Sequence, residues 1–150
     1  AMEFLLRRDV PGWKKTKADD VMSMQTGIMG RKGRIHYHCS TCIDAFLDTL
    51  DPAMPKGELF DTVARHIDRA IHSNYRLYAG NYVAADTLWP GEGYGEHFTE
   101  AERRVFEDYV GGQLARIELE GKDEPFLREC ILRMYANPVR NNRAALAATV

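Results

Sequence analysis

Two histidines and two cysteines lie within seven residues of one another, at His36, His38, Cys39 and Cys42. Imidazole nitrogen and thiolate sulfur are ligands that zinc prefers, so this cluster is the first candidate for chemistry. On a β-strand, however, His36 and His38 share one face and Cys39 points to the other. All four reach one tetrahedral ion only if the strand breaks at His38, and no second such pair accompanies them. The pattern favours a half-buried strand with small apolar cysteines, and we predict neither a metal nor a cofactor.

Three other patterns carry less chemical information. A nucleophile at Cys39 or Cys42 paired with a histidine has no identifiable third residue to orient the pair. The glycines of residues 91–95 lack the spacing of a dinucleotide-binding turn, so we expect a flexible loop there. Lysines follow Trp13 closely, but the isoelectric point near 6.2 argues against nucleic acid as a partner.

The alternation of residue types over residues 34–39 predicts a short strand. Ile35, Tyr37 and Cys39 would form its apolar, half-buried face, with basic residues on the other face. A single strand cannot satisfy its own backbone N–H and C=O groups. We therefore expect it to pair with residues 75–78, with a second copy of the chain, or with a sheet that the chain lacks.

Apolar residues at helical spacing predict a long amphipathic helix over residues 58–75. They recur three or four positions apart, which places one stripe against a core and leaves the charged residues in water. The stripe consists of Phe60, Val63, Ala64, Ile67, Ile71 and Tyr75.

Local start and stop signals predict further helices. Thr99 and Glu102 form a capping box at the start of one helix. Asp123, with Pro125 in the first turn, predicts a last helix that ends before Asn137. Other helices are expected at residues 3–8, from Asp19 or Asp20 to Gly30, and at residues 43–50.

The composition is that of a globular protein. The 150 residues are 45% hydrophobic and 28% charged, which is ordinary for a chain that buries a core. No signal peptide or bilayer-spanning apolar run is visible, and three cysteines give no disulfide framework, so we expect a soluble cytoplasmic protein. The predicted fold is α+β and mainly α, with amphipathic helices around one or two short strands. It forms a single domain, residues 1–150, with a frayed tail at 139–150.

Basic residues gather in the N-terminal third of the chain. Residues 1–34 contain eight Lys or Arg against four Asp or Glu, although the whole chain has a net charge of -2. Such a local field can attract an anionic membrane surface, but an ordinary solvated surface explains it better. The candidate contacts with an anionic surface are Lys14, Lys15, Lys17, Arg31, Lys32 and Arg34.

Four segments, residues 19–27, 32–38, 67–75 and 80–86, together resemble the C-terminal part of bacterial glycerolipid acyltransferases of the lysophosphatidic-acid acyltransferase type. The resemblance spans most of the chain. It implies a parent enzyme that moves an acyl group from a thioester carrier to a hydroxyl of a glycerol phosphate in phospholipid synthesis.

In that family a histidine acts as the base and an aspartate five residues later orients it. The five histidines here are followed at that distance by Thr41, Ile43, Ile71, Leu77 and Glu102. We therefore assign no catalytic residue. We expect the chain to be a C-terminal fragment that is inactive alone and that has the catalytic half of the same protein as its partner. Its expected location is the inner face of the membrane. The alternative is a free-standing binding or assembly protein that dimerises through its strand edge.

Overall fold

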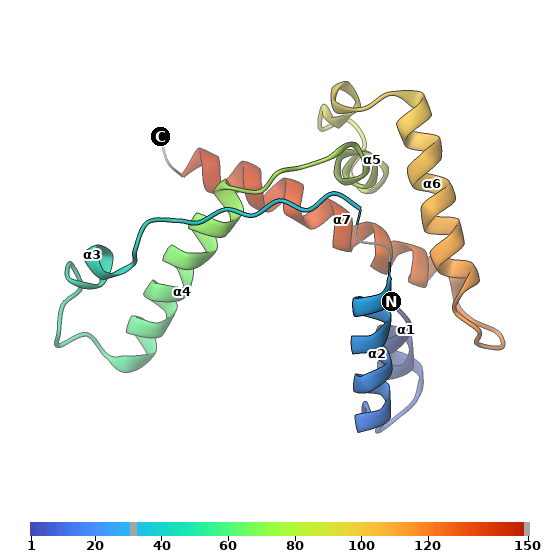
Figure 1. Ribbon diagram of the computed structural model, residues 1–150, viewed down its shortest axis with the longest axis horizontal. Coiled ribbons are helices and arrows are strands. Elements are labelled where there is room, and N and C mark those ends of the chain that lie inside the picture. Colours follow the sequence, from blue (N-terminus) through green and yellow to red (C-terminus); the bar gives the residue numbers. More distant parts are fainter. Residues whose placement is uncertain (31–32, 149–150) are drawn as a thin grey trace. The chain divides into compact units, whose positions relative to one another are not determined.

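The computed structural model of the protein describes residues 1–30 and 33–148. Within these residues the regular elements are helices, and no strand is present (Figure 1). The α+β class, with its small β element, is therefore wrong. The chain divides into two compact units, and each is described here by itself. The first unit comprises Ala1–Ile35 and Tyr78–Ala136, and the second comprises His36–Leu77 and Asn137–Val150.

The helices of the first unit begin where the local signals predict. Thr99 Oγ1 accepts a hydrogen bond from Glu102 N at 3.3 Å, and the Glu102 carboxylate accepts one from Thr99 N at 2.8 Å. Asp123 Oδ1 accepts from Phe126 N at 3.0 Å, so both predicted caps are confirmed. The helices are α1 (Met2–Asp9), α2 (Lys17–Met29), α5 (Ala79–Leu88), the short 3-10 helix η1 (Tyr94–His97), α6 (Glu100–Ala115) and the first part of α7 (Glu124–Ala147).

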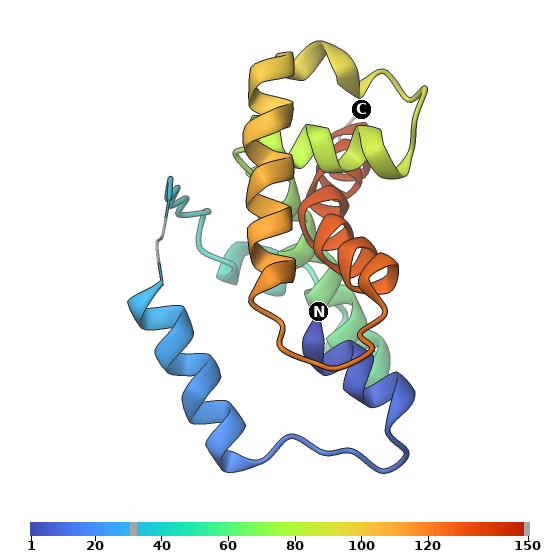
Figure 2. The ribbon, with the colours of Figure 1, turned by 90° about the vertical axis from the view of Figure 1, so that its right-hand side faces the viewer.

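Helices α5, α6 and α7 supply most of the core of the first unit. Helix α5 crosses α6 (Figure 2), and Gly80 allows a close approach, because a Cβ atom built there would lie 2.8 Å from the Phe106 ring. Helix α1 adds Leu5 to the core, and its Arg8 pairs with Asp123 at 2.9 Å. The other buried residues of this unit are Val83, Ala84, Ala85, Tyr94, Phe106, Val110, Leu114, Leu127, Ile131, Leu132 and Ala136.

The second unit contains α3 (Asp44–Leu47), α4 (Lys56–Ser73) and the last part of α7. The Phe46 and His66 rings stack at a centroid distance of 3.7 Å and join α3 to α4. Asn142 of α7 donates a hydrogen bond to the carbonyl oxygen of His72 at 2.8 Å, which satisfies a backbone group at the end of α4. Among the described residues of this unit, only Val139 and Ala145 are buried.

The long helix predicted over residues 58–75 is confirmed as α4, but the side of the helix predicted to be buried is wrong. Phe60, Ile67 and Ile71 of the predicted core stripe are exposed. The half-buried residues of α4 lie on the neighbouring side, which packs within the unit and includes Val63 and His66. Periodicity identifies an apolar arc but does not say which part of that arc meets a neighbouring element.

The two predicted strands are wrong. Residues 34–39 and 75–78 form coil, and no backbone hydrogen bond joins either segment to the other among the described residues. Ile35 and Tyr37, expected to be half-buried, are exposed. Residues 79–81, expected to end the second strand, instead begin α5. An alternating sequence favours extended backbone, but a strand forms only where a second segment supplies the hydrogen bonds.

The last helix does not end before Asn137. Helix α7 includes Pro138 and continues to Ala147, so residues 139–147, expected as a frayed tail, are helical. Proline removes one backbone hydrogen bond from a helix interior. Burial of Val139 and Ala145 and the Asn142 hydrogen bond to α4 offset that loss.

Candidate functional site

An open groove of about 910 Å³ lies in the first unit beside α5, α6 and α7. Its lining is mostly apolar and includes four aromatic rings, which come from α6, from α7 and from the residue that precedes α5. The rings are Tyr78, Phe106, Tyr109 and Tyr135, and the charged residues of the lining are Arg34, Glu102 and Asp108. The described residues of this lining include no histidine or cysteine. An apolar, aromatic lining with a few polar groups is typical of a binding groove.

Ring contacts and hydrogen bonds join several of the residues that line the groove. The hydroxyls of Tyr109 and Tyr135 lie 2.7 Å apart, and the Phe106 and Tyr135 rings meet edge to face with centroids 5.2 Å apart. Asn81 donates a hydrogen bond to the carbonyl oxygen of Tyr135 at 2.9 Å. Burial, followed by the hydrogen bond with Tyr109, raises the pKa of Tyr135 above its ordinary value. The Tyr135 phenol is therefore neutral at physiological pH and is not a base.

Arg34 and Glu102 are two of the charged residues that line the groove. The guanidinium of Arg34 lies over the Tyr78 ring, 5.6 Å from its centroid. Hydrogen bonds from the Thr99 backbone N–H and hydroxyl lower the pKa of Glu102, with a smaller contribution from the charge of Arg34. The Glu102 carboxylate accepts hydrogen bonds from Thr99 in the capping box of α6, so its role is to stabilise the start of that helix.

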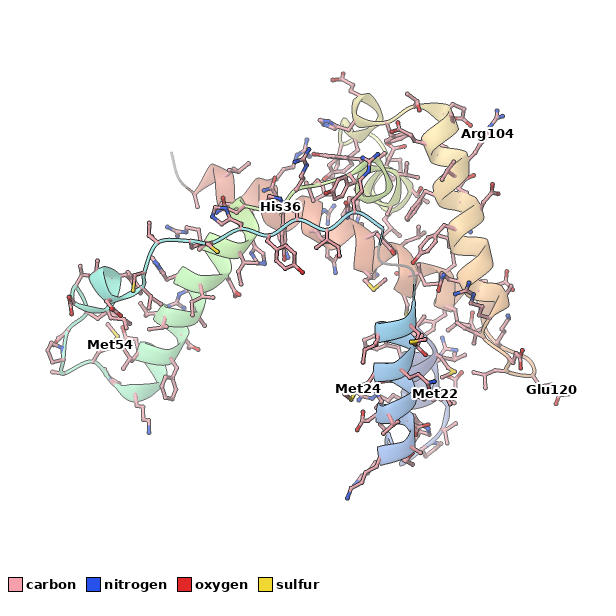
Figure 3. All side chains as sticks on the ribbon, viewed as in Figure 1. Met22, Met24, His36, Met54, Arg104 and Glu120 are labelled. Atoms are coloured by element: carbon pink, nitrogen blue, oxygen red, sulfur yellow. The ribbon has the colours of Figure 1, made fainter. Side chains whose placement is uncertain are left out.

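The metal candidates of the sequence do not form a site. His36, His38, Cys39 and Cys42 all lie exposed on coil (Figure 3 labels His36), and each cysteine is a free thiol. Over the described residues, no group of three or more His, Cys, Asp or Glu side chains is arranged to hold a metal ion.

The candidate contacts with an anionic surface differ in side-chain exposure and in ion pairing. Lys14, Lys17 and Arg34 are exposed. Lys15 is half-buried and pairs with Glu3 at 2.8 Å and with Asp20 at 3.1 Å, so its charge is engaged within the first unit. The remaining two candidates, Arg31 and Lys32, lie outside the described residues.

Two helices present uncovered apolar surface, which the sequence reasoning missed. No residue of α2 (Lys17–Met29) is buried, and Met22 and Met24 project from it into solvent (Figure 3). In α4, Phe60, Ile67 and Ile71 are 60%, 42% and 48% exposed. A signal was present for α4, since its apolar arc is wider than one packing contact needs. Sequence alone could not reveal that part of the arc stays uncovered.

Comparison of the chain with protein-family models, with curated proteins and with solved structures gives no match. Among residues 1–30 and 33–148, no helix has the length and hydropathy that crossing a bilayer requires.

Proposed function

We propose that this chain is the C-terminal accessory part of a glycerolipid acyltransferase of the lysophosphatidic-acid type, and that it transfers no acyl group by itself. The resemblance of four sequence segments supports the parent activity. The lack of a histidine followed five residues later by aspartate supports the accessory role. The observation that carries the proposal is the apolar surface that α2 and α4 leave uncovered.

The uncovered surface of α4 is energetically significant. Fully burying a Phe or Ile side chain stabilises a protein by about 1.5–3 kcal/mol. Phe60, Ile67 and Ile71 are 60%, 42% and 48% exposed, so α4 alone leaves about 2–4 kcal/mol of such stabilisation unrealised. A catalytic half that covers this face would recover that energy, and this makes it the expected partner.

The exposed basic residues suit a place at the inner face of the membrane in the cytoplasm. Lys14, Lys17 and Arg34 can contact anionic headgroups, with a gain of about 1 kcal/mol for each charge near the surface. The chain should therefore bind vesicles containing phosphatidylglycerol, but not phosphatidylcholine vesicles, and 1 M salt should release it. Lys14→Glu with Lys17→Glu should weaken this binding at least tenfold, whereas Lys56→Glu, a charge reversal in the second unit, should not. Equal binding to both vesicle types would contradict the membrane role.

An acyl-transfer assay tests the central proposal. The isolated chain should give no transfer from acyl-CoA or acyl carrier protein to lysophosphatidate. The natural gene product that contains the chain should give transfer, and that activity should fall when residues 56–73 are replaced by a polar helix of equal length. Transfer by the isolated chain would refute the accessory role, and an inactive gene product would refute the parent activity.

A second candidate is a free-standing assembly protein that dimerises through residues 34–39. The coil conformation and exposure of this alternating segment favour it. It predicts a monomer–dimer equilibrium in sedimentation that Tyr37→Pro abolishes while the helical content of the chain is kept.

A further inference from the structure

The groove beside α5, α6 and α7 presents the ring surfaces of three tyrosines. Tyr109 is 42% exposed, and Tyr78 and Tyr135 are half-buried, whereas Phe106 is buried and packs on the Tyr109 and Tyr135 rings. The planes of Tyr109 and Tyr135 are nearly perpendicular, at 86°. The face of a neutral phenol ring carries partial negative charge, so such surfaces attract a cation.

A cation of the chain itself already lies on one of these rings. The Arg34 guanidinium lies 5.6 Å from the centroid of the Tyr78 ring, and Arg34 is exposed. Gly33 precedes it in the lining with a φ of +65°, a left-handed conformation that favours glycine. The structure therefore shows which kind of group this ring surface accepts. A single cation–π contact at an exposed position is weak, so a second cation can displace the guanidinium.

The charges of the lining favour a cation over an anion. Among the described lining residues, two carboxylates, Glu102 and Asp108, are opposed by one guanidinium, Arg34. Hydrogen bonds from Thr99 hold the pKa of Glu102 below its ordinary value, so this carboxylate keeps its negative charge. Asp108 is exposed and lies further along the same helix. An anion in the groove would meet two like charges, whereas a cation is attracted by both.

The rest of the lining favours an organic cation over a metal ion. It consists of Ala79, Gly80, Ala101 and Val105, whose side chains offer no oxygen ligand. Calcium takes about six to eight oxygen ligands, and magnesium keeps several waters. Over the described residues no cluster of side chains is arranged to hold a metal. An alkylated ammonium group instead buries apolar surface and places its charge on aromatic rings.

We propose that the groove binds a small organic cation with apolar substituents, such as a quaternary ammonium compound, and that Arg34 takes its place on Tyr78 in the free chain. The charge of the ligand lies on the Tyr78 ring, and its apolar part lies against the aliphatic lining. This binding site goes beyond the proposed function and does not depend on it.

Three probes that share a benzyl group and differ in charge test the proposal. They are benzyltrimethylammonium, benzyl alcohol and phenylmethanesulfonate, each titrated into the whole chain at low salt and followed by NMR. The cation should bind at least about fivefold more tightly than the alcohol. Its methyl protons should show nuclear Overhauser effects to the Tyr78 ring.

The anionic probe is the decisive control, because Arg31 and Lys32 precede Gly33 in the sequence. Equal binding of the three probes, or tighter binding of the sulfonate, would overturn the proposal. A bound cation without contacts to the Tyr78 ring would overturn it as well.

Matched variants test the assigned residues. Tyr78→Leu keeps an apolar side chain but removes the ring, so it should weaken binding of the cation at least about threefold and leave the alcohol nearly unaffected. Tyr78→Phe, which keeps the ring, should bind the cation like the wild type. Asp108→Asn should weaken binding of the cation more than Glu107→Gln, since the exposed Glu107 lies outside the described lining.

Arg34→Ala tests the competition. It vacates the Tyr78 ring and removes a positive charge, so the cation should bind at least about twofold more tightly. Weaker binding by this variant would overturn the place given to Arg34, and equal loss of cation and alcohol binding in Tyr78→Leu would overturn the cation site. Acyl transfer enters none of these measurements, so the proposed function can fail without affecting their outcome.

Discussion

Replacing Gly80 with alanine tests the packing of α5 on α6. A Cβ atom at this position would lie 2.8 Å from Cδ2 and 3.2 Å from Cε2 of Phe106, closer than van der Waals contact allows. The Phe106 ring cannot easily move away, because it is buried and packs edge to face on Tyr135. Overpacking of this kind costs about 1–3 kcal/mol. Alanine recovers up to about 1 kcal/mol of helix propensity, so Gly80→Ala should give a net destabilisation of up to about 2 kcal/mol.

Gly111 provides a matched control for the sign of this effect. It also lies in a helix, α6, but nothing stands within 4 Å of the position of its Cβ. Gly111→Ala should therefore add only the higher helix propensity of alanine, without a steric cost, and stabilise the protein by about 1 kcal/mol. Urea unfolding followed by circular dichroism measures both changes as shifts in the transition midpoint.

A double variant separates steric overlap from other causes. Phe106→Leu removes the ring atoms that Cβ would meet, so Gly80→Ala should cost less in the Phe106→Leu background than in the wild type. The two changes should be coupled by at least about 0.5 kcal/mol. If Gly80→Ala stabilises the protein as much as Gly111→Ala does, the close approach of α5 to Phe106 is refuted.

Two further perturbations test single hydrogen bonds. Asn142→Ala removes the donor to the His72 carbonyl at the end of α4 and should destabilise the protein by about 1 kcal/mol in urea unfolding. The neighbouring Asn141 is exposed, and its Nδ2 lies 3.5 Å from His72 Nε2. Asn141→Ala should therefore change the free energy of unfolding by less than about 0.5 kcal/mol. The folded-state pKa of Glu102 is lowered below its ordinary value of 4.5, so its stabilising effect is present above that value and is lost as the pH falls through the lower folded pKa. Glu102→Ala should therefore lower the melting temperature at pH 7, and the difference from wild type should disappear towards pH 2.

The ends of several helices could be predicted from the sequence because their signals are local. Thr99 with Glu102 and Asp123 before Pro125 start helices through hydrogen bonds that span three residues. Gly30 ends α2 as expected. Thr16, rather than Asp19 or Asp20, is the residue that caps α2, and Asp19 returns the bond from inside the helix. The predicted cap therefore lies three or four residues after the observed one.

The predictions that depend on distant parts of the chain were the ones that failed. Alternation over residues 34–39 does not show whether a second segment is present to pair with it. Pro138 predicts a break, yet packing of Val139 and Ala145 and the Asn142 hydrogen bond keep α7 helical. Helix α5 was missed because the tyrosines before it suggested a strand.

The groove and the uncovered faces could not have been found in the sequence. Tyr78, Phe106 and Tyr135 are separated by 28 and 29 residues along the chain and share one groove only because α5, α6 and α7 pack together. Amino-acid order by itself determined where helices start, which residues are apolar and where charge gathers, since these depend on neighbours within a turn or two. Tertiary structure decided which apolar residues are covered, because burial depends on segments far apart in the chain.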